Sequence, residues 1–234
     1  MIYLHVIAEG QTEKRFVDHL LAPYLGYDYC VDTSLVMTSK DLSRGRRYKG
    51  GLGNYRKVKN DIVRRLKQHH GAGHCFTTMF DLYALPMDFP GFSESQMIID
   101  PYQKVKQFEN ALADDVDDNR FIPYIQLHEF EAMIFVEPGQ LVFEYPDMGL
   151  KIEELNRVLD EKNIKNNPEL IDEGEETAPS KRILKIIADY NKPIAGVNTV
   201  ERIGINAIRN RNKCPHFNDW LCQLENLKSN LPQQ

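Results

Sequence analysis

Short hydrophobic runs alternate with longer segments of helical periodicity over the first 135 residues of the chain. Three of these runs, at residues 2–8, 29–37 and 74–80, have the length and composition of buried strands. A fourth strand is predicted within residues 120–130, and a helical turn or short helix at residues 129–135. Because strands that alternate with helices form parallel sheets covered by helices, the pattern predicts an α/β fold.

The segments between and after these strands have the single hydrophobic face of amphipathic helices. The first helical segment begins near Thr12, whose hydroxyl can serve as the N-cap, and Pro23 and Gly26 mark its end. Further helices are predicted at residues 55–69, 101–116, 150–162, 180–190, 200–209 and 217–227.

The character of the chain changes after Pro138, where strand patterns stop and helical patterns continue. We therefore predict an α/β domain at residues 1–137. The remaining residues, 138–234, are predicted to form a mainly helical C-terminal extension that packs on this domain.

Composition agrees with a globular protein. The 234 residues are 42% hydrophobic and 10% aromatic, which is sufficient for a sizeable core. No run approaches the roughly 18 apolar residues of a membrane span, and the N-terminal pattern is that of a strand rather than a signal peptide. Four scattered cysteines are typical of a reducing compartment, so we expect a cytoplasmic protein without membrane contact.

Positive charge is concentrated in one part of this acidic chain. Residues 40–67, here called the basic block, contain eleven lysines and arginines and two acids, a net charge of +9, whereas the other residues carry −14. Such a block is expected where a phosphate-bearing partner binds, and the alternative is a solvated helix face beside a charged loop. Its glycines would let the backbone approach a ligand. The contacts that we expect with nucleic-acid phosphates are those of Arg46, Arg47, Lys49 and Lys57.

Acidic residues directly follow two of the predicted strands. Glu9 follows the first strand, Asp81 follows the third, and Glu13 lies on the first turn of the next helix. Ligands of open α/β sheets bind outside the carboxyl ends of the strands, and Mg²⁺ prefers a few carboxylates together with water and phosphate oxygens. We therefore predict a hard-cation site here, beside Gly10, which lets a substrate come near. For Glu13 the alternative is stabilisation of the helix N-terminus.

The sequence HEFE at residues 128–131 places His128 and Glu131 three residues apart. If this segment is helical, the two side chains share one face and can ligate a metal or transfer protons. It is not the two-histidine zinc motif, because residue 132 is not a histidine. The alternative is a buried hydrogen-bonded network.

Two further patterns carry less information. Cys214, His216 and Cys222 lack a recognisable fourth zinc ligand, so we expect core cysteines around Trp220. In PSKR, residues 179–182, Ser180 can cap a helix whose first turn holds Lys181 and Arg182. Positive charge at that position opposes the helix dipole, which indicates an anionic partner or a nearby acid, and solvent exposure explains it equally well.

Six segments together resemble, in order, the sequence blocks of the DUF4276 family. They are VIAEGQTEKRF, TTMFDLYALPMDFPG, FIPYIQLHEFEAMIF, PELID, APSKRI and CPHFNDWL, and they span nearly the whole chain. Members of this family are considered Toprim-like, so the resemblance implies a Toprim-like, Rossmannoid parallel sheet flanked by helices.

The resemblance also implies a chemistry. Toprim domains are metal-dependent phosphoryl-transfer modules of topoisomerases, primases and OLD-type nucleases. Their first motif, a strand ending in Glu-Gly, matches Glu9 and Gly10. Their Asp-x-Asp motif is matched by Asp81 alone, because Tyr83 stands where the second Asp would be. The missing ligand then has to come from elsewhere, and the candidates are Glu13, Glu129 and Glu131.

These observations predict a Mg²⁺- or Mn²⁺-dependent nuclease. Glu9, Asp81 and Glu131 would hold the metal. Catalytic roles would fall to Glu9, Glu13, Asp81 and His128, and substrate contacts to Gly10, Tyr83, Lys181, Arg182 and the basic block. Some Toprim nucleases act with an ATPase in anti-phage defence, which implies such a partner. The alternatives are a catalytically degenerate adaptor subunit of an ATPase complex, and a small-molecule phosphohydrolase or nucleotide-acting enzyme with a closed pocket.

Overall fold

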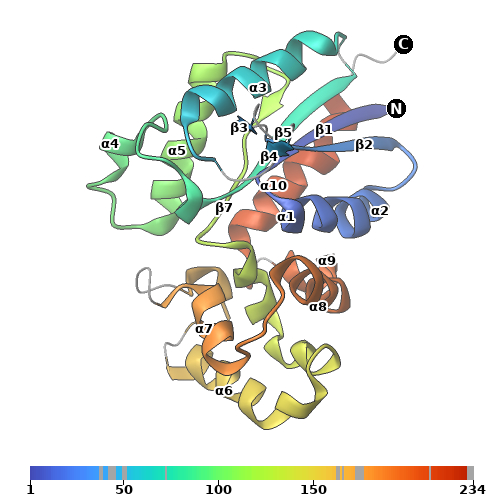
Figure 1. The fold of residues 1–234 in the computed structure, drawn as a ribbon. Coiled ribbons are helices and arrows are strands. Elements are labelled where there is room, and N and C mark those ends of the chain that lie inside the picture. Colours follow the sequence, from blue (N-terminus) through green and yellow to red (C-terminus); the bar gives the residue numbers. More distant parts are fainter. Residues whose placement is uncertain are drawn as a thin grey trace.

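A parallel sheet lies at the centre of the computed structural model, which describes residues 1–36, 39–41, 46–48, 52–71, 73–161, 164, 166–171, 177–210 and 212–230 (Figure 1). For residues 39–41, 46–48 and 230, the backbone alone is described. Within these residues, the sheet has five strands: β1 (Ile2–Ala8), β2 (Tyr29–Leu35), β5 (His74–Asp81), β6 (Phe121–Ile122) and β7 (Ile125–Gln126). A separate antiparallel pair consists of β3 (Ser39–Asp41) and β4 (Arg46–Tyr48).

The strand order creates a switch point between β1 and β5. The order is β2-β1-β5-β6, all parallel, and β7 also pairs with β5. The chain therefore leaves β1 in one direction to form β2 and returns to add β5 on the other side. In open α/β sheets, ligands bind outside the carboxyl ends of the strands at such a point.

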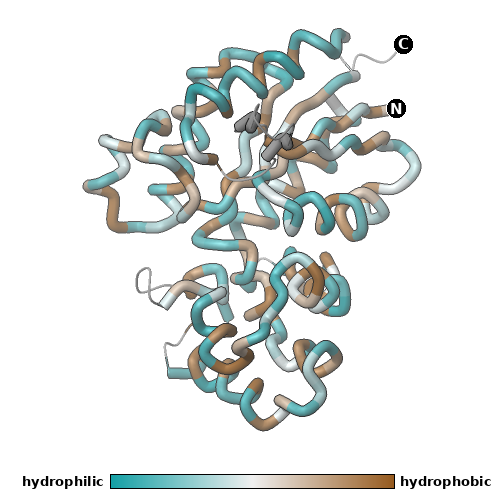
Figure 2. Tube along the Cα trace, viewed as in Figure 1, coloured by the Kyte–Doolittle hydropathy of each residue, from teal (hydrophilic) through white to brown (hydrophobic). Residues whose placement is uncertain are grey.

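Helices cover both faces of the sheet (Figure 1). One face packs against the continuous helical segment of α1 (Gln11–Phe16), the π-helical turn η1 (Val17–Leu21) and α2 (Ala22–Leu25), and against α10 (Pro215–Glu225). The other face packs against α3 (Tyr55–Gln68) and α5 (Pro101–Val116). Hydrophilic and hydrophobic residues alternate along these helices, as expected for elements with one buried side (Figure 2).

The residues between β7 and α10 form a mostly helical lobe, which lies below the sheet in Figure 1. It begins with the 3₁₀ helix η3 (Phe130–Val136), which confirms the predicted short helix. The lobe continues with η4 (Pro138–Phe143), η5 (Pro146–Met148), α6 (Gly149–Glu161), η6 (Pro168–Leu170), α7 (Pro179–Ile186), the π-helical turn η8 (Lys192–Gly196), α8 (Val197–Ile203) and α9 (Ile205–Ile208). The short elements η2 (Leu82–Ala84) and α4 (Phe92–Ser95) lie between β5 and α5, and η9 (Asn226–Asn230) follows α10.

The chain returns to the sheet in α10. The indole Nε1 of Trp220 donates a hydrogen bond to the Thr77 hydroxyl of β5 at 2.9 Å, and the Tyr29 hydroxyl of β2 donates to the carbonyl of Leu224 at 2.7 Å. The C-terminal residues thus contact the sheet directly. The boundary between residues 137 and 138 stays a prediction.

The predicted α/β fold and helical C-terminal part are confirmed, and several local predictions need correction. The predicted fourth strand is two short strands, because Pro123 between them has no N–H for the ladder. The N-cap of α1 is Gly10 rather than Thr12, and α7 ends at Ile186. The helix predicted at residues 200–209 is divided at Gly204, whose φ of 79° lies in the left-handed region.

None of the helices in the described ranges is both long enough and apolar enough to cross a membrane. The four cysteines are free, and Cys214 lies in the buried core beside Trp220, as predicted.

Candidate carboxylate site at the switch point

The ends of β1 and β5 bring Glu9 and Asp81 together. Asp81 is the last residue of β5, and Glu9 follows the last residue of β1, which pairs with β5 in parallel register. The backbone N–H of Asp81 donates a hydrogen bond to Oε2 of Glu9 at 3.1 Å. Two carboxylates on adjacent strands therefore lie at the switch point of the sheet.

Glu13 joins this pair from the first turn of α1. Its Oε2 accepts a hydrogen bond from the backbone N–H of Gly10 at 2.9 Å, and its side chain is buried. The carboxylate thus stabilises the start of α1, as the helix alternative predicts. It also adds negative charge beside Asp81.

A lysine from the helical lobe connects this site to a fourth carboxylate. Nζ of Lys192 lies 3.0 Å from Oδ2 of Asp81 and 3.0 Å from Oε2 of Glu131. The other oxygen of Asp81 accepts a hydrogen bond from the N–H of Phe130 at 2.9 Å, where η3 begins. Glu131 is fully buried, and its Oε1 has no hydrogen-bond partner among the described residues.

Burial makes ionisation of this cluster costly. It raises the pKa of Glu9 to about 8, of Glu13 to about 7 and of Glu131 to about 8, and repulsion by neighbouring carboxylates contributes in each case. The pKa of Asp81 is also raised by burial. The positive charge of Lys192 lowers the pKa of all four groups without cancelling these effects. A second cation at the site would favour the ionised forms.

His128 is buried, and it lies outside the helix, so the condition for a face shared with Glu131 is not met. Its φ of 64° places it before η3 in the left-handed region, so His128 and Glu131 do not share a helical face. Its ring lies 5.4 Å from the ring of Tyr83, and its carbonyl accepts from the N–H of Tyr83 at 3.2 Å. Tyr83 is 40% exposed, at the rim of this region.

The start of α7 is held by Glu129. Its carboxylate accepts a hydrogen bond from the backbone N–H of Ser180 at 2.9 Å. Glu129 is therefore a nearby acid at this helix start, one of the alternatives that the PSKR sequence indicates. Ser180 itself is inside the helix, because the N-cap is Ala178. Lys181 is exposed and Arg182 is half-buried on the same first turn.

The structure divides the basic block. Arg46 and Arg47 belong to β4, whose side chains are not described, and Lys49 lies outside the described residues. On α3, Lys59 pairs with Asp115 at 2.8 Å, and both Arg64 and Arg65 pair with Asp61. These three side chains therefore have acidic partners within the protein. Arg56, Lys57 and Lys67 are exposed.

Lys192 is the member of the site that sequence reasoning missed. It lies 111 residues after Asp81, and no strand or motif links the two positions. One signal was present, since Lys192 begins a helical turn and is followed by Pro193. Positive charge at the start of a helical turn opposes the backbone dipoles, so an acidic partner was to be expected, as at Lys181 and Arg182.

Fold and site together define an α/β protein with a doubly covered parallel sheet and a buried carboxylate cluster at its switch point. The model of the family DUF4276, described as a domain of unknown function, matches residues 8–225. The chain therefore belongs to the DUF4276 family. Comparisons with curated proteins and with solved structures found no match.

Proposed function

We propose that this protein hydrolyses phosphodiester bonds of nucleic acid with the help of a divalent cation. The observation that carries the proposal is the convergence of Glu9, Asp81 and Glu131 at the switch point. The backbone N–H of Asp81 donates to the Glu9 carboxylate, and the Lys192 ammonium contacts the carboxylates of Asp81 and Glu131. The relation to Toprim nucleases that the sequence resemblance implies agrees with this chemistry.

The donor set fits a hard cation. Carboxylate oxygens are the ligands that Mg²⁺ and Mn²⁺ prefer, and Glu131 offers a buried oxygen, Oε1, without a hydrogen-bond partner among the described residues. Glu9, Asp81 and Glu131 would hold the ion. A bound Mg²⁺ or Mn²⁺ supplies a Lewis acid for phosphoryl oxygens and lowers the pKa of a coordinated water.

The other residues of the site have roles that follow from their positions. The side chain of Lys192 is one third exposed, and its ammonium would contact a phosphate oxygen while it remains beside Asp81. Glu13, on the first turn of α1, and His128 are the candidates for proton transfer. Gly10 and the partly exposed Tyr83 would contact the substrate near the carboxylates, and Lys181 and Arg182 would contact the nucleic-acid backbone from α7.

The location of α3 supports a nucleic-acid substrate. Its N-terminus is held by Asp88, which follows β5 and accepts from the N–H of Tyr55 at 3.1 Å. The exposed Arg56 and Lys57 therefore lie at the edge of the sheet that carries the carboxylates. Contacts of this kind would bind phosphates without reading sequence.

We also propose that the protein is located in the cytoplasm, because all four cysteines are free, as is typical of a reducing compartment. An ATPase partner in anti-phage defence is part of the proposal that rests on the resemblance to Toprim nucleases alone.

A second candidate is a non-catalytic adaptor subunit with the same fold. One observation favours it: Lys192 already provides a positive charge for Asp81 and Glu131, so the cluster is partly compensated without a metal. The position of Tyr83 in place of a second Asp agrees with this reading. The two candidates differ in whether the carboxylates bind a divalent cation.

The test is a cleavage assay with purified protein on plasmid, single-stranded DNA and RNA, in Mg²⁺ and in Mn²⁺. Glu9→Gln and Asp81→Asn should each lower the cleavage rate about 100-fold or more, because each removes a charge at the reacting centre. Glu153→Gln, an exposed position of α6, serves as the matched control.

Three outcomes separate the candidates. Cleavage that both site variants lose supports the nuclease. Equal cleavage by wild type and both variants would place the activity elsewhere. A wild-type protein that neither cleaves nor binds Mn²⁺ by calorimetry would exclude a nuclease active on its own and favour the adaptor.

A further inference from the structure

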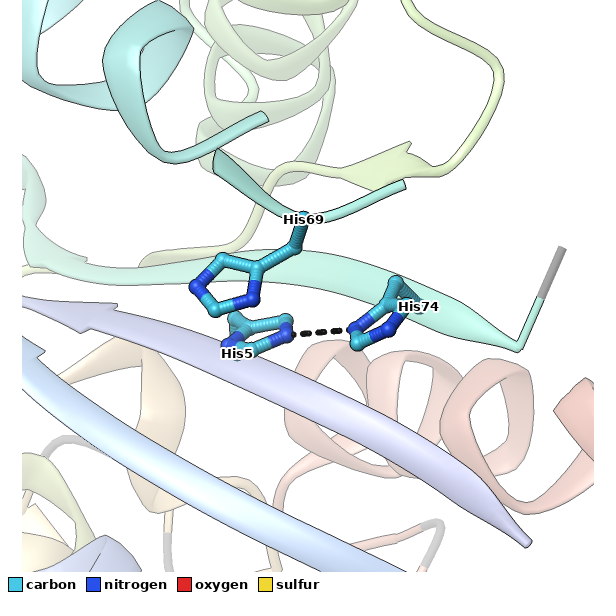
Figure 3. A group of neighbouring side chains, drawn as sticks. All are labelled: His5, His69 and His74. Atoms are coloured by element: carbon cyan, nitrogen blue, oxygen red, sulfur yellow. Dashed lines mark hydrogen bonds between the residues drawn. The ribbon is translucent and has the colours of Figure 1, made fainter. Parts of the chain in front are cut away.

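Three histidines gather at the opposite end of the sheet from the carboxylates. His5 is on β1, His74 is the first residue of β5, and His69 directly follows α3. One ring nitrogen of each lies within 4.8 Å of the others (Figure 3). His5 precedes Glu9 by four residues along an extended strand, which separates the two clusters by about 13 Å. This cluster is therefore distinct from the carboxylate site.

Existing contacts already orient the imidazoles. Nε2 of His5 and Nδ1 of His74 are 3.0 Å apart, and the rings of His5 and His69 stack with their centroids 4.1 Å apart. Nδ1 of His5 lies 3.5 Å from Oδ2 of Asp32 on the neighbouring strand β2. If His5 donates its Nδ1 proton to Asp32, its Nε2 presents a lone pair toward His74.

We propose that His5, His69 and His74 bind a transition-metal cation of the Zn²⁺ class, with Asp32 orienting His5 from the outer shell and water completing the coordination. This site goes beyond the proposed function and does not depend on it. It would take a cation by nitrogen ligation, whereas the carboxylate site offers oxygen alone.

The chemistry of the three side chains fits such a cation. Imidazole nitrogens bind Zn²⁺, Co²⁺, Ni²⁺ and Cu²⁺, and a histidine ligand commonly donates its other N–H to a carboxylate, as His5 can to Asp32. Bond lengths of about 2.0–2.1 Å in a tetrahedral site require ligand nitrogens about 3.4 Å apart. The pair of His5 and His74 is already near this spacing, and a rotation of the half-buried His69 ring would bring in the third nitrogen.

The surroundings also favour neutral imidazoles, the form that binds metals. Burial and the charges of neighbouring histidines lower the pKa of His5 and of His74. Arg120 contributes to the lowered pKa of His74, and its own charge is paired with Asp118 at 2.7 Å. The half-buried side chains of His69 and His74 leave a route from solvent.

A metal at this position would connect three elements. It would tie the C-terminal end of α3 to β1 and to the beginning of β5, at the edge of the sheet where β5 begins. Such a clip stabilises the folded state because the ligands are not preorganised in the unfolded chain.

The experiment is a titration with Co²⁺ of untagged protein freed of transition metals, in excess Mg²⁺ to occupy the carboxylate site, followed by visible d–d absorption and by competition with Zn²⁺. One equivalent per chain is expected. Asp32→Asn should weaken Co²⁺ binding by roughly 10–100-fold, the usual cost of losing an outer-shell partner. A larger loss is expected for each variant that removes a ligand: His5→Gln, His69→Gln and His74→Gln. Circular dichroism checks that each variant is folded.

Two controls separate this site from others. His19→Gln changes a histidine that faces Glu201 on the other side of the molecule, and Asp81→Asn changes the carboxylate cluster. Neither should alter the Co²⁺ spectrum or stoichiometry. The proposal is overturned if wild type binds no Co²⁺, if the three histidine variants bind it as wild type does, or if Asp81→Asn alone abolishes the signal. Failure here would leave the nuclease proposal unaffected, since cleavage is assayed in Mg²⁺ and Mn²⁺.

Discussion

At the scale of single residues, Lys192 makes the buried carboxylate cluster tolerable. Asp81 and Glu131 are almost inaccessible to solvent, and burying ionised groups is strongly unfavourable unless they are paired. Lys192 reaches both at 3.0 Å, and their charges raise the pKa of its ammonium although burial alone would lower it. The ammonium therefore stays charged at neutral pH.

Replacing Lys192 by Met should destabilise the protein in a pH-dependent way. Burial raises the pKa of Glu131 from 4.5 to about 8, so its ionisation opposes folding as the pH rises through that window. Without Lys192 this pKa rises further and the window extends above pH 8. We expect a loss in the free energy of unfolding of about 2 kcal/mol at pH 9, below the value for fully buried pairs because Lys192 is partly exposed.

Urea denaturation of metal-free protein at pH 6 and pH 9 measures this difference. Lys185→Met, an exposed position of α7, is the control and should be close to wild type at both values. A loss of the same size at pH 6 and pH 9 would contradict the electrostatic explanation.

The sequence predicted part of this site for a physical reason. Parallel strands end at one edge of a sheet, so acids that follow two such strands, Glu9 and Asp81, were expected to meet. The start of a helical turn at Lys192 indicates an acidic partner, but which acids it contacts depends on how the helical lobe packs against the sheet. The left-handed backbone of His128 was equally hidden, because only a small fraction of residues other than glycine adopt it, even though histidine does so more often than most.

At the scale of elements, Glu169 holds the start of α10. Its fully buried carboxylate accepts hydrogen bonds from the backbone N–H groups of His216 at 3.0 Å and Phe217 at 2.9 Å. These donors belong to the first turn of α10 and have no partner within the helix. The Tyr102 hydroxyl on α5 donates to the same carboxylate at 3.3 Å. One side chain thus connects η6, α5 and α10.

We expect Glu169→Ala to lower the free energy of unfolding by about 3 kcal/mol, because it leaves two buried donors without an acceptor and removes a favourable charge at a helix N-terminus. Glu169→Gln keeps one acceptor oxygen and should lose roughly half as much. Urea denaturation measures both, with the exposed Glu153→Ala on α6 as control. Equal stability of Glu169→Ala and Glu153→Ala would show that water replaces the carboxylate.

Element boundaries were predictable where local chemistry decides them. The segments α3, α5 and α6 begin and end within two residues of their predicted bounds, since each has a clear hydrophobic face. Pro123 and Gly204 can be read from the sequence, but the interruptions they cause cannot. The break at Pro123 depends on how the flanking strands pair with β5, and the break at Gly204 depends on the φ that this glycine adopts. Propensity alone does not determine either.

At the scale of the whole molecule, α3 runs along the sheet from the edge where the strands end to the opposite edge, where they begin. Its N-terminus is fixed by Asp88 after β5, and its C-terminal end by Arg120, which donates to the carbonyl of His69 at 2.8 Å just before β6. Arg56 and Lys57 therefore belong to the edge with the carboxylates, and Lys67 to the edge with the histidines. The total charge of the basic block did not reveal this division.

If nucleic acid approaches the carboxylate edge, the two ends of α3 should contribute unequally to binding. The double variant Arg56→Ala/Lys57→Ala removes two phosphate contacts, so the slope of log K against log salt for duplex DNA should become shallower by about 2. Fluorescence anisotropy with a labelled duplex at 50–200 mM salt, roughly the range over which such contacts weaken strongly, measures the slope. The matched control, Lys67→Ala/Lys151→Ala, removes the same charge from exposed positions at the other end of α3 and on α6, and should leave the slope unchanged. Because both variants alter the net charge equally, equal slopes would show that binding follows total charge, and the carboxylate edge would lose its place as the proposed nucleic-acid surface.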